Sequence, residues 1–98
     1  MTELTLIVHV YAKPDQVDRV KSALFQLIEP TRQEEGCIAY TLHQDNEDPA
    51  HFVFHECWAS RACWQAHLDT PHLAAYRTVA EEAVESFTLS EMRVINRL

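Results

Sequence analysis

The fold is decided first by the stretch LTLIVHVYA at residues 4–12. Its apolar side chains fall on alternate positions: Leu4, Leu6, Val8 and Val10. This period of two, with β-branched neighbours, predicts a strand that turns one face toward a core. Lys13-Pro14-Asp15 then breaks the pattern, and Pro14 suits the first position of a helix.

An amphipathic helix is predicted directly after this strand. Apolar residues recur at spacings of three and four and form one stripe: Val17, Val20, Leu24, Leu27 and Ile28. Pro30 lies inside this pattern and should kink or shorten the helix. Glu34-Glu35-Gly36 resembles a last helical turn that is closed by a C′ glycine.

A β-hairpin is predicted next, because residues 38–42 and 52–58 alternate in polarity around a turn-rich segment at 44–50. Ser60 can cap a short helix that runs through Leu68. Thr70-Pro71 starts a second helical stretch, which turns several residues inward: Leu73, Tyr76, Val79, Ala80 and Val84. Residues 87–96 alternate again and predict a closing strand.

The resulting order of elements is βαββαβ, which indicates an α+β, ferredoxin-like antiparallel sheet with both helices on one face. The chain of 98 residues is too short for two cores, so we expect one domain over residues 1–98. Two helices leave the other face of the sheet uncovered, and apolar residues lie there: Ile7, Tyr11, Ala39, Val53 and Cys57. A face-to-face homodimer would bury them.

Composition excludes several classes of protein. Fifteen acidic and eight basic residues give a net charge of −7, which disfavours binding to nucleic acid. No apolar stretch is long enough to cross a membrane, and the first residues lack a secretory pattern. Three cysteines without a Cys-x-x-Cys pair fit a reducing compartment and small core side chains, so we expect a cytoplasmic location.

Strong local motifs for phosphate, dinucleotide or zinc binding are missing. One glycine cannot build a Walker loop or a dinucleotide fingerprint, and no Gly-x-Ser-x-Gly or His-Glu-x-x-His run occurs. None of the six histidines has standard zinc spacing, so we expect no metal. Glu34-Glu35 is interpreted as part of a solvated helix face.

The aromatic segment from Phe52 to Tyr76 carries the candidate site. Phe54, Glu56 and Trp58 share one face of the predicted strand, and three residues of the next helix lie on neighbouring turns: Trp64, His67 and Leu68. If they meet, they enclose an aromatic cavity with an imidazole at its edge. The alternative is that Phe54, Trp58 and Trp64 are ordinary core residues. A neutral His67 could accept a proton near pH 7.

Four motifs, in this order and spacing, resemble the antibiotic biosynthesis monooxygenase domain family, including its bacterial quinol monooxygenase type. They are Glu34-Glu35-Gly36-Cys37-x-x-Tyr40, His43-Gln44-Asp45 with Asp48-Pro49, Glu56-x-Trp58-x-Ser60, and Ala66-His67-Leu68-x-Thr70-Pro71-His72-x-x-x-Tyr76. The resemblance covers nearly the whole chain. It implies a dimeric α+β barrel, in which two ferredoxin-like sheets pack face to face and each subunit holds a pocket between sheet and helices.

The resemblance also implies an activity, since members of this family oxidise quinols, anthrones or polycyclic phenols with molecular oxygen and without a cofactor. His67 would be the catalytic base, and the substrate pocket would hold Phe54, Trp58, Trp64, His72 and Tyr76. Trp58 matches the family's pocket tryptophan, whereas Phe54 and Trp64 replace the polar Asn and Tyr of the aromatic-polyketide members. For Glu56 we expect a structural polar role, through a hydrogen bond or ion pair to an arginine, and proton transfer is the alternative.

Three alternatives stay open at this point. Haem-degrading relatives use an Asn, a Trp and an axial His at positions that hold Ile7, His67 and Arg77 here. An isomerase branch acts on phosphorylated sugars, for which Arg61 and Arg77 are the available cations. The fold also serves in non-catalytic, small-molecule-binding or stress-related dimeric modules, because a fold does not determine function.

Overall fold

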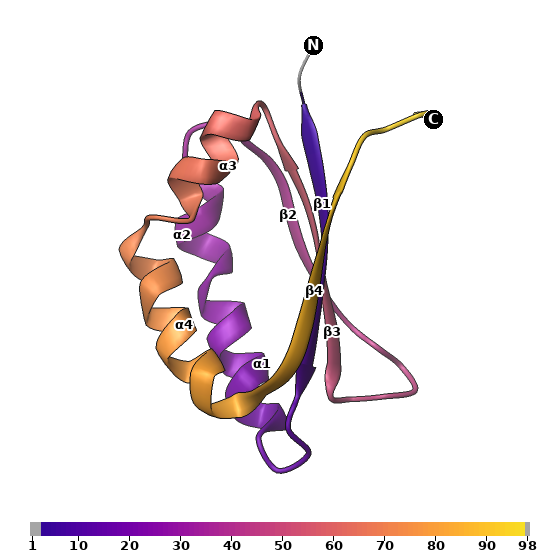
Figure 1. The fold of residues 1–98 in the computed structure, drawn as a ribbon, viewed down its shortest axis with the longest axis vertical. Helices are drawn as coiled ribbons and strands as arrows, with labels where there is room; N and C mark the ends of the chain where they lie inside the picture. The colour runs from indigo at the N-terminus through magenta and orange to yellow at the C-terminus, as the bar shows by residue number, and fades with distance from the viewer. Residues whose placement is uncertain (1–2, 98) are drawn as a thin grey trace.

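The computed structural model describes residues 3–97. Along the chain the elements are β1 (Leu4–Ala12), α1 (Val17–Gln26), α2 (Ile28–Arg32), β2 (Cys37–Gln44), β3 (His51–Trp58), α3 (Arg61–His67), α4 (Pro71–Ala83) and β4 (Val84–Met92) (Figure 1). The strands form one sheet in the order β2-β3-β1-β4, and each neighbouring pair is antiparallel. The predicted ferredoxin-like α+β fold is therefore confirmed.

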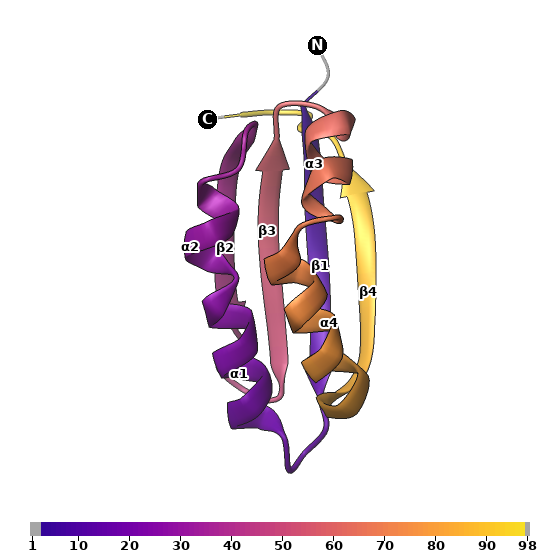
Figure 2. The ribbon, with the colours of Figure 1, turned by 90° about the vertical axis from the view of Figure 1, so that its left-hand side faces the viewer.

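All the helices lie on one face of the sheet, with α1 and α2 beside α3 and α4 (Figure 2). Alternation along β1 places Leu6, Val8 and Val10 under these helices, as the sequence predicts. None of the helices within residues 3–97 is long and apolar enough to span a bilayer.

The first helix differs from its prediction at its start. Pro14 lies in the turn before α1, which begins only at Val17, so the expected position of Pro14 inside the helix was wrong. The predicted effect of Pro30 is confirmed, since the helix is split: α1 ends at Gln26 and α2 carries Pro30. Proline has no N–H for the carbonyl four residues earlier, which is that of Gln26. Gly36 has a φ of 82°, as a residue that reverses the chain requires.

The predicted caps of the later helices are present. Ser60 Oγ accepts a hydrogen bond from the backbone N–H of Cys63 at 3.2 Å. Thr70 Oγ1 accepts one from the N–H of Leu73 at 3.4 Å. The last strand starts at Val84 and not at residue 87, because Val84 pairs with Ala12 of β1 and this tertiary pairing overrides the helical pattern of the sequence.

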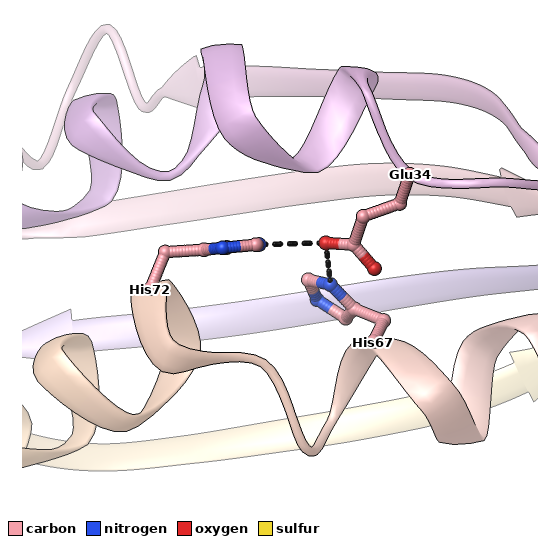
Figure 3. A group of neighbouring side chains, drawn as sticks. All are labelled: Glu34, His67 and His72. Carbon is pink, nitrogen blue, oxygen red and sulfur yellow. Dashed lines mark hydrogen bonds and ion pairs between the residues drawn. The ribbon is translucent and has the colours of Figure 1, made fainter.

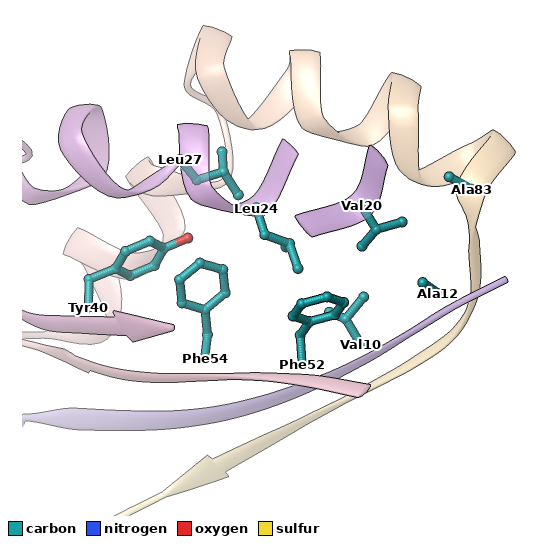
Figure 4. Close-up of a cluster of buried hydrophobic side chains, with 9 residues drawn as sticks. All are labelled: Val10, Ala12, Val20, Leu24, Leu27, Tyr40, Phe52, Phe54 and Ala83. Atoms are coloured by element: carbon teal, nitrogen blue, oxygen red, sulfur yellow. The ribbon is translucent and has the colours of Figure 1, made fainter. Parts of the chain in front are cut away.

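Two clusters of buried side chains hold the layers together. The larger cluster joins both helical pairs to the sheet (Figure 4) and contains Val10, Ala12, Val20, Leu24, Leu27, Tyr40, Phe52, Phe54 and Ala83. The smaller one contains Leu4, Leu6 and Trp58. Burial of each Val, Leu or Phe contributes about 1.5–3 kcal/mol before the cost of ordering the chain.

The opposite face of the sheet carries the residues predicted for it. The register pairs Ile7 with His55 and Ser90, Tyr11 with His51, and Ala39 with Cys57, so these side chains share that face. No helix among residues 3–97 covers it (Figure 1). Tyr11 is 37% exposed there and Met92 is 49% exposed.

Candidate active site

A cavity of about 610 Å³ lies between the helices and the covered face of the sheet. Its apolar walls include Val8 of β1, Phe54 of β3 and Leu73 of α4. The polar groups that reach it include Tyr40, Glu56, His67, Tyr76 and Arg77. A mostly apolar hollow with a few convergent polar groups is the form that small-molecule sites usually take.

The structure brings five of the seven predicted site residues to this cavity. Phe54, Glu56, Trp64, His67 and Tyr76 all line it. Trp58 and His72 are not among the lining residues that the structure describes.

The expectation that Trp58 flanks a substrate ring is corrected by its burial. Trp58 is 0% exposed, and its indole Nε1 donates a 2.9 Å hydrogen bond to Oε1 of Glu56. Its ring lies 4.9 Å from that of His67, centroid to centroid. Trp58 therefore packs in the smaller core cluster, where it contacts Glu56 and His67 of the cavity wall from behind.

His72 is turned toward a carboxylate outside the cavity. Oε2 of Glu34 lies 2.6 Å from Nε2 of His72 and 2.9 Å from Nδ1 of His67 (Figure 3). Glu34 follows α2, whereas His67 ends α3 and His72 lies in the first turn of α4, so three separate segments meet at one oxygen atom. These three side chains are also the described group whose ligand atoms could hold a metal ion.

This contact determines which nitrogen of His67 carries its proton. An ionised carboxylate only accepts hydrogen bonds, so Nδ1 of His67 donates to Glu34. In the neutral ring the lone pair then lies on Nε2, for which no hydrogen-bond partner occurs among residues 3–97. Burial lowers the pKa of His67 below its ordinary value, and the Glu34 carboxylate offsets part of that effect.

Glu34 is the member of this cluster that the sequence prediction missed. It was interpreted as part of a solvated face, yet its side chain is only 15% exposed. The correction has a tertiary cause, since its partners lie 33 and 38 residues further along the chain. The resemblance motif that contains Glu34 was the only signal in the sequence that could have singled it out.

Glu56 is a buried carboxyl group on the cavity wall. It is 5% exposed, and burial raises its pKa from 4.5 to about 7, although the hydrogen bond from Trp58 opposes this shift. The predicted arginine partner is wrong, because the bonded donor is the Trp58 indole. Glu56 is thus poised to hold or release a proton near neutral pH.

Two tyrosines, Tyr40 and Tyr76, also reach the cavity. Tyr40 stacks on Phe54 with ring centroids 4.3 Å apart and lies edge-on to His67 at 5.8 Å. Burial raises the pKa of Tyr40, and it raises that of Tyr76 to about 12. Both groups therefore stay protonated at neutral pH and can donate a hydrogen bond to a bound oxygen atom.

The three cysteines are free thiols, with Cys57 buried and Cys37 and Cys63 half-buried. Burial raises the pKa of Cys37 and of Cys57. A raised pKa disfavours the thiolate, which is the reactive form, so these two side chains suit packing better than nucleophilic chemistry.

The sequence matches the family model described as antibiotic biosynthesis monooxygenase over residues 4–79. The chain belongs to this family. The probable quinol monooxygenase YgiN of Escherichia coli is 33% identical over an alignment of 101 positions, which covers 93% of this chain and 92% of YgiN.

Two further proteins are similar to this family member. An uncharacterized protein of Synechocystis, sll1783, is 34% identical over 64 residues, and the match covers 65% of this chain but only 44% of sll1783. The crystal structure of PA3566 from Pseudomonas aeruginosa superposes with a TM-score of 0.94 at 29% identity, covering 98% of this chain and 97% of that one.

The positions that haem-degrading relatives would use are not gathered at one site. Ile7 lies on the uncovered face of the sheet, whereas His67 and Arg77 line the cavity on the other face. His67 also bonds Glu34 through Nδ1. This arrangement does not favour the haem-binding alternative.

Proposed function

We propose that this family member is a cofactor-independent monooxygenase that oxidises a quinol or a related phenolic aromatic molecule with O₂. The observation that carries the proposal is the buried His67, which lines the apolar cavity while its Nδ1 contacts Glu34. Trp64 and Phe54 offer aromatic surface on which a substrate ring can pack. The name of YgiN supports a quinol as the substrate class to test first.

The protein has to remove one proton from the substrate and to provide an apolar environment for the reacting ring. Nε2 of His67 accepts the proton of a ring hydroxyl, and Glu34 stabilises the imidazolium that results. The electron-rich phenolate then passes one electron to O₂, and the two radicals combine to form a carbon–oxygen bond. The mostly apolar walls offer water few hydrogen-bonding partners, which favours reaction of the phenolate with O₂.

The overall reaction balances without an external reductant. The O–O bond breaks, one oxygen atom stays on the ring, and the other leaves as water after it takes up protons that the substrate has released. For a quinol, one ring C–H becomes C–OH while the two ring hydroxyls become carbonyls. His67 and Glu56, whose pKa burial raises to about 7, can return a proton to the leaving oxygen.

Oxygen uptake with naphthoquinol substrates tests the proposal. We expect His67→Ala to lower the rate at least about tenfold. The control is His43→Ala, which alters an exposed histidine of β2 outside the cavity. Equal rates in wild type and His67→Ala would contradict the role of His67. Quenching of tryptophan fluorescence by these phenols without any turnover would instead support a non-catalytic binding module.

A homodimer belongs to the same proposal. The uncovered face exposes Tyr11 and Met92 and carries the half-buried Ile7 and Val53, and a second copy would cover them. Sedimentation should give twice the chain mass of 11.3 kDa. Val53→Lys places a charge on this face and should shift the protein toward the monomer. A wild-type species of single-chain mass at micromolar concentration would contradict the dimer.

A further inference from the structure

The three side chains that meet at Glu34 have the composition of a metal site. Two imidazole nitrogens and one carboxylate oxygen converge, and one ligand atom from each residue lies within 4.8 Å of the others. This donor set binds Zn²⁺ and related divalent ions in proteins and leaves a fourth position for water.

We propose that Glu34, His67 and His72 bind one divalent transition-metal ion of the Zn²⁺ class. The ion would replace the two protons that now lie between the carboxylate and the imidazoles. Ligands on a tetrahedral Zn²⁺ are about 3.4 Å apart, since each bond is about 2.1 Å long. The observed contacts of 2.6 Å and 2.9 Å would therefore open by less than about 1 Å.

Burial and charge favour binding at this cluster. The His67 side chain is 3% exposed, whereas those of His72 and Glu34 are 21% and 15% exposed, so an ion can enter from solvent on the His72 side. The net charge of −7 adds a general attraction for cations.

The second cluster of histidines on the molecule lacks this convergence. On the uncovered face, Nε2 of His51 contacts His9 and Nδ1 of His51 contacts Asp45. Both nitrogens of His51 are thus directed to different partners, and the three residues form a chain rather than a pocket for one ion. His51 therefore offers a matched control for the proposed site.

A bound ion would change the state of His67. Coordination through Nδ1 leaves the proton of the neutral ring on Nε2, so that nitrogen no longer offers a lone pair to a substrate hydroxyl. Glu34 and His72 do not line the cavity, which places the ion behind His67 rather than beside the substrate. Metal binding and quinol oxidation should exclude each other. This consequence rests on the proposed function, whereas the metal site does not.

Titration of the purified chain with Zn²⁺, followed by calorimetry, tests the site directly. We expect one ion per chain, and Co²⁺ should give the visible absorption of a tetrahedral complex. Glu34→Gln and His72→Gln should each weaken binding at least about tenfold, while His51→Gln should bind as wild type does. Thermal unfolding of each variant establishes that it is folded, and if Glu34→Gln is not, His72→Gln decides the outcome alone.

Two results would overturn the site: a wild-type chain that does not bind Zn²⁺, or binding that His51→Gln abolishes and His72→Gln leaves intact. A second experiment measures oxygen uptake with the naphthoquinol in the presence of increasing Zn²⁺. Inhibition should follow the same midpoint as Zn²⁺ binding and be reversed by a chelator. If the chain binds Zn²⁺ but oxidises no quinol, the site stands and the proposed function fails.

Discussion

Glu34 Oε2 lies 2.9 Å from Nδ1 of His67, although 33 residues separate the two along the chain. The carboxylate belongs to the turn between α2 and β2, and the imidazole is the last residue of α3. Packing of the helices over the sheet thus gives a buried histidine one bonded nitrogen and one available nitrogen.

Glu34→Gln should lower kcat for quinol oxidation by about tenfold to a hundredfold and change KM little. The amide removes the negative charge that stabilises the imidazolium after His67 takes a proton. Steady-state oxygen uptake measures both constants. Glu35→Gln is the matched control, because Glu35 is the exposed neighbour. A loss of the same size in both variants would refute a specific role for Glu34.

Glu56 should make the free energy of unfolding fall as the pH rises. Its pKa is raised from 4.5 to about 7, so the folded protein binds more protons than the unfolded chain between these values. The stabilising contribution is complete below pH 4.5 and is lost as the pH rises through about 7.

The matched variant for this pH effect is Glu56→Gln, which keeps an oxygen atom as acceptor for the Trp58 indole but does not titrate. Relative to wild type, it should gain up to about 3 kcal/mol on going from pH 5 to pH 8. Urea unfolding at the two pH values gives this difference. A stability difference that does not change with pH would contradict the raised pKa of Glu56.

The two tryptophans should separate binding from stability. Trp64 lines the cavity, so Trp64→Ala should weaken phenol binding by about tenfold or more, as measured by calorimetry. Trp58→Phe removes the donor to Glu56 and should lower the free energy of unfolding by about 1–3 kcal/mol. If Trp58→Phe weakened binding and left stability unchanged, Trp58 would belong to the substrate surface after all.

Gly36→Ala should destabilise the fold by about 2–4 kcal/mol. The backbone has a φ of 82°, and an added Cβ would collide with Cys63 Sγ and lie 2.7 Å from Cys63 Cβ. Chemical denaturation measures the loss. Adding Cys63→Ala should restore only part of it, because the Cβ contact and the strained φ remain. Full recovery in the double variant would show that the backbone conformation is not strained.

The alternation of residues 4–12 and 52–58 was sufficient to predict β1 and β3, and the capping residues Ser60 and Thr70 were sufficient to predict the starts of α3 and α4. These signals are local, since side chains two, three or four positions apart determine which face is apolar and which N–H is capped. The same local rules placed Phe54, Glu56 and His67 on surfaces that face each other.

Other features depend on contacts between distant segments and were decided only by the tertiary structure. Pairing of Val84 with Ala12 moved the start of β4, and close packing carried Trp58 out of the cavity wall into the core. Glu34 became a partner of His67 and His72 because the turn after α2 packs against the junction of α3 and α4. The periodicity of the sequence does not predict these contacts. They form only when separate helices and strands pack together and bury the side chains between them.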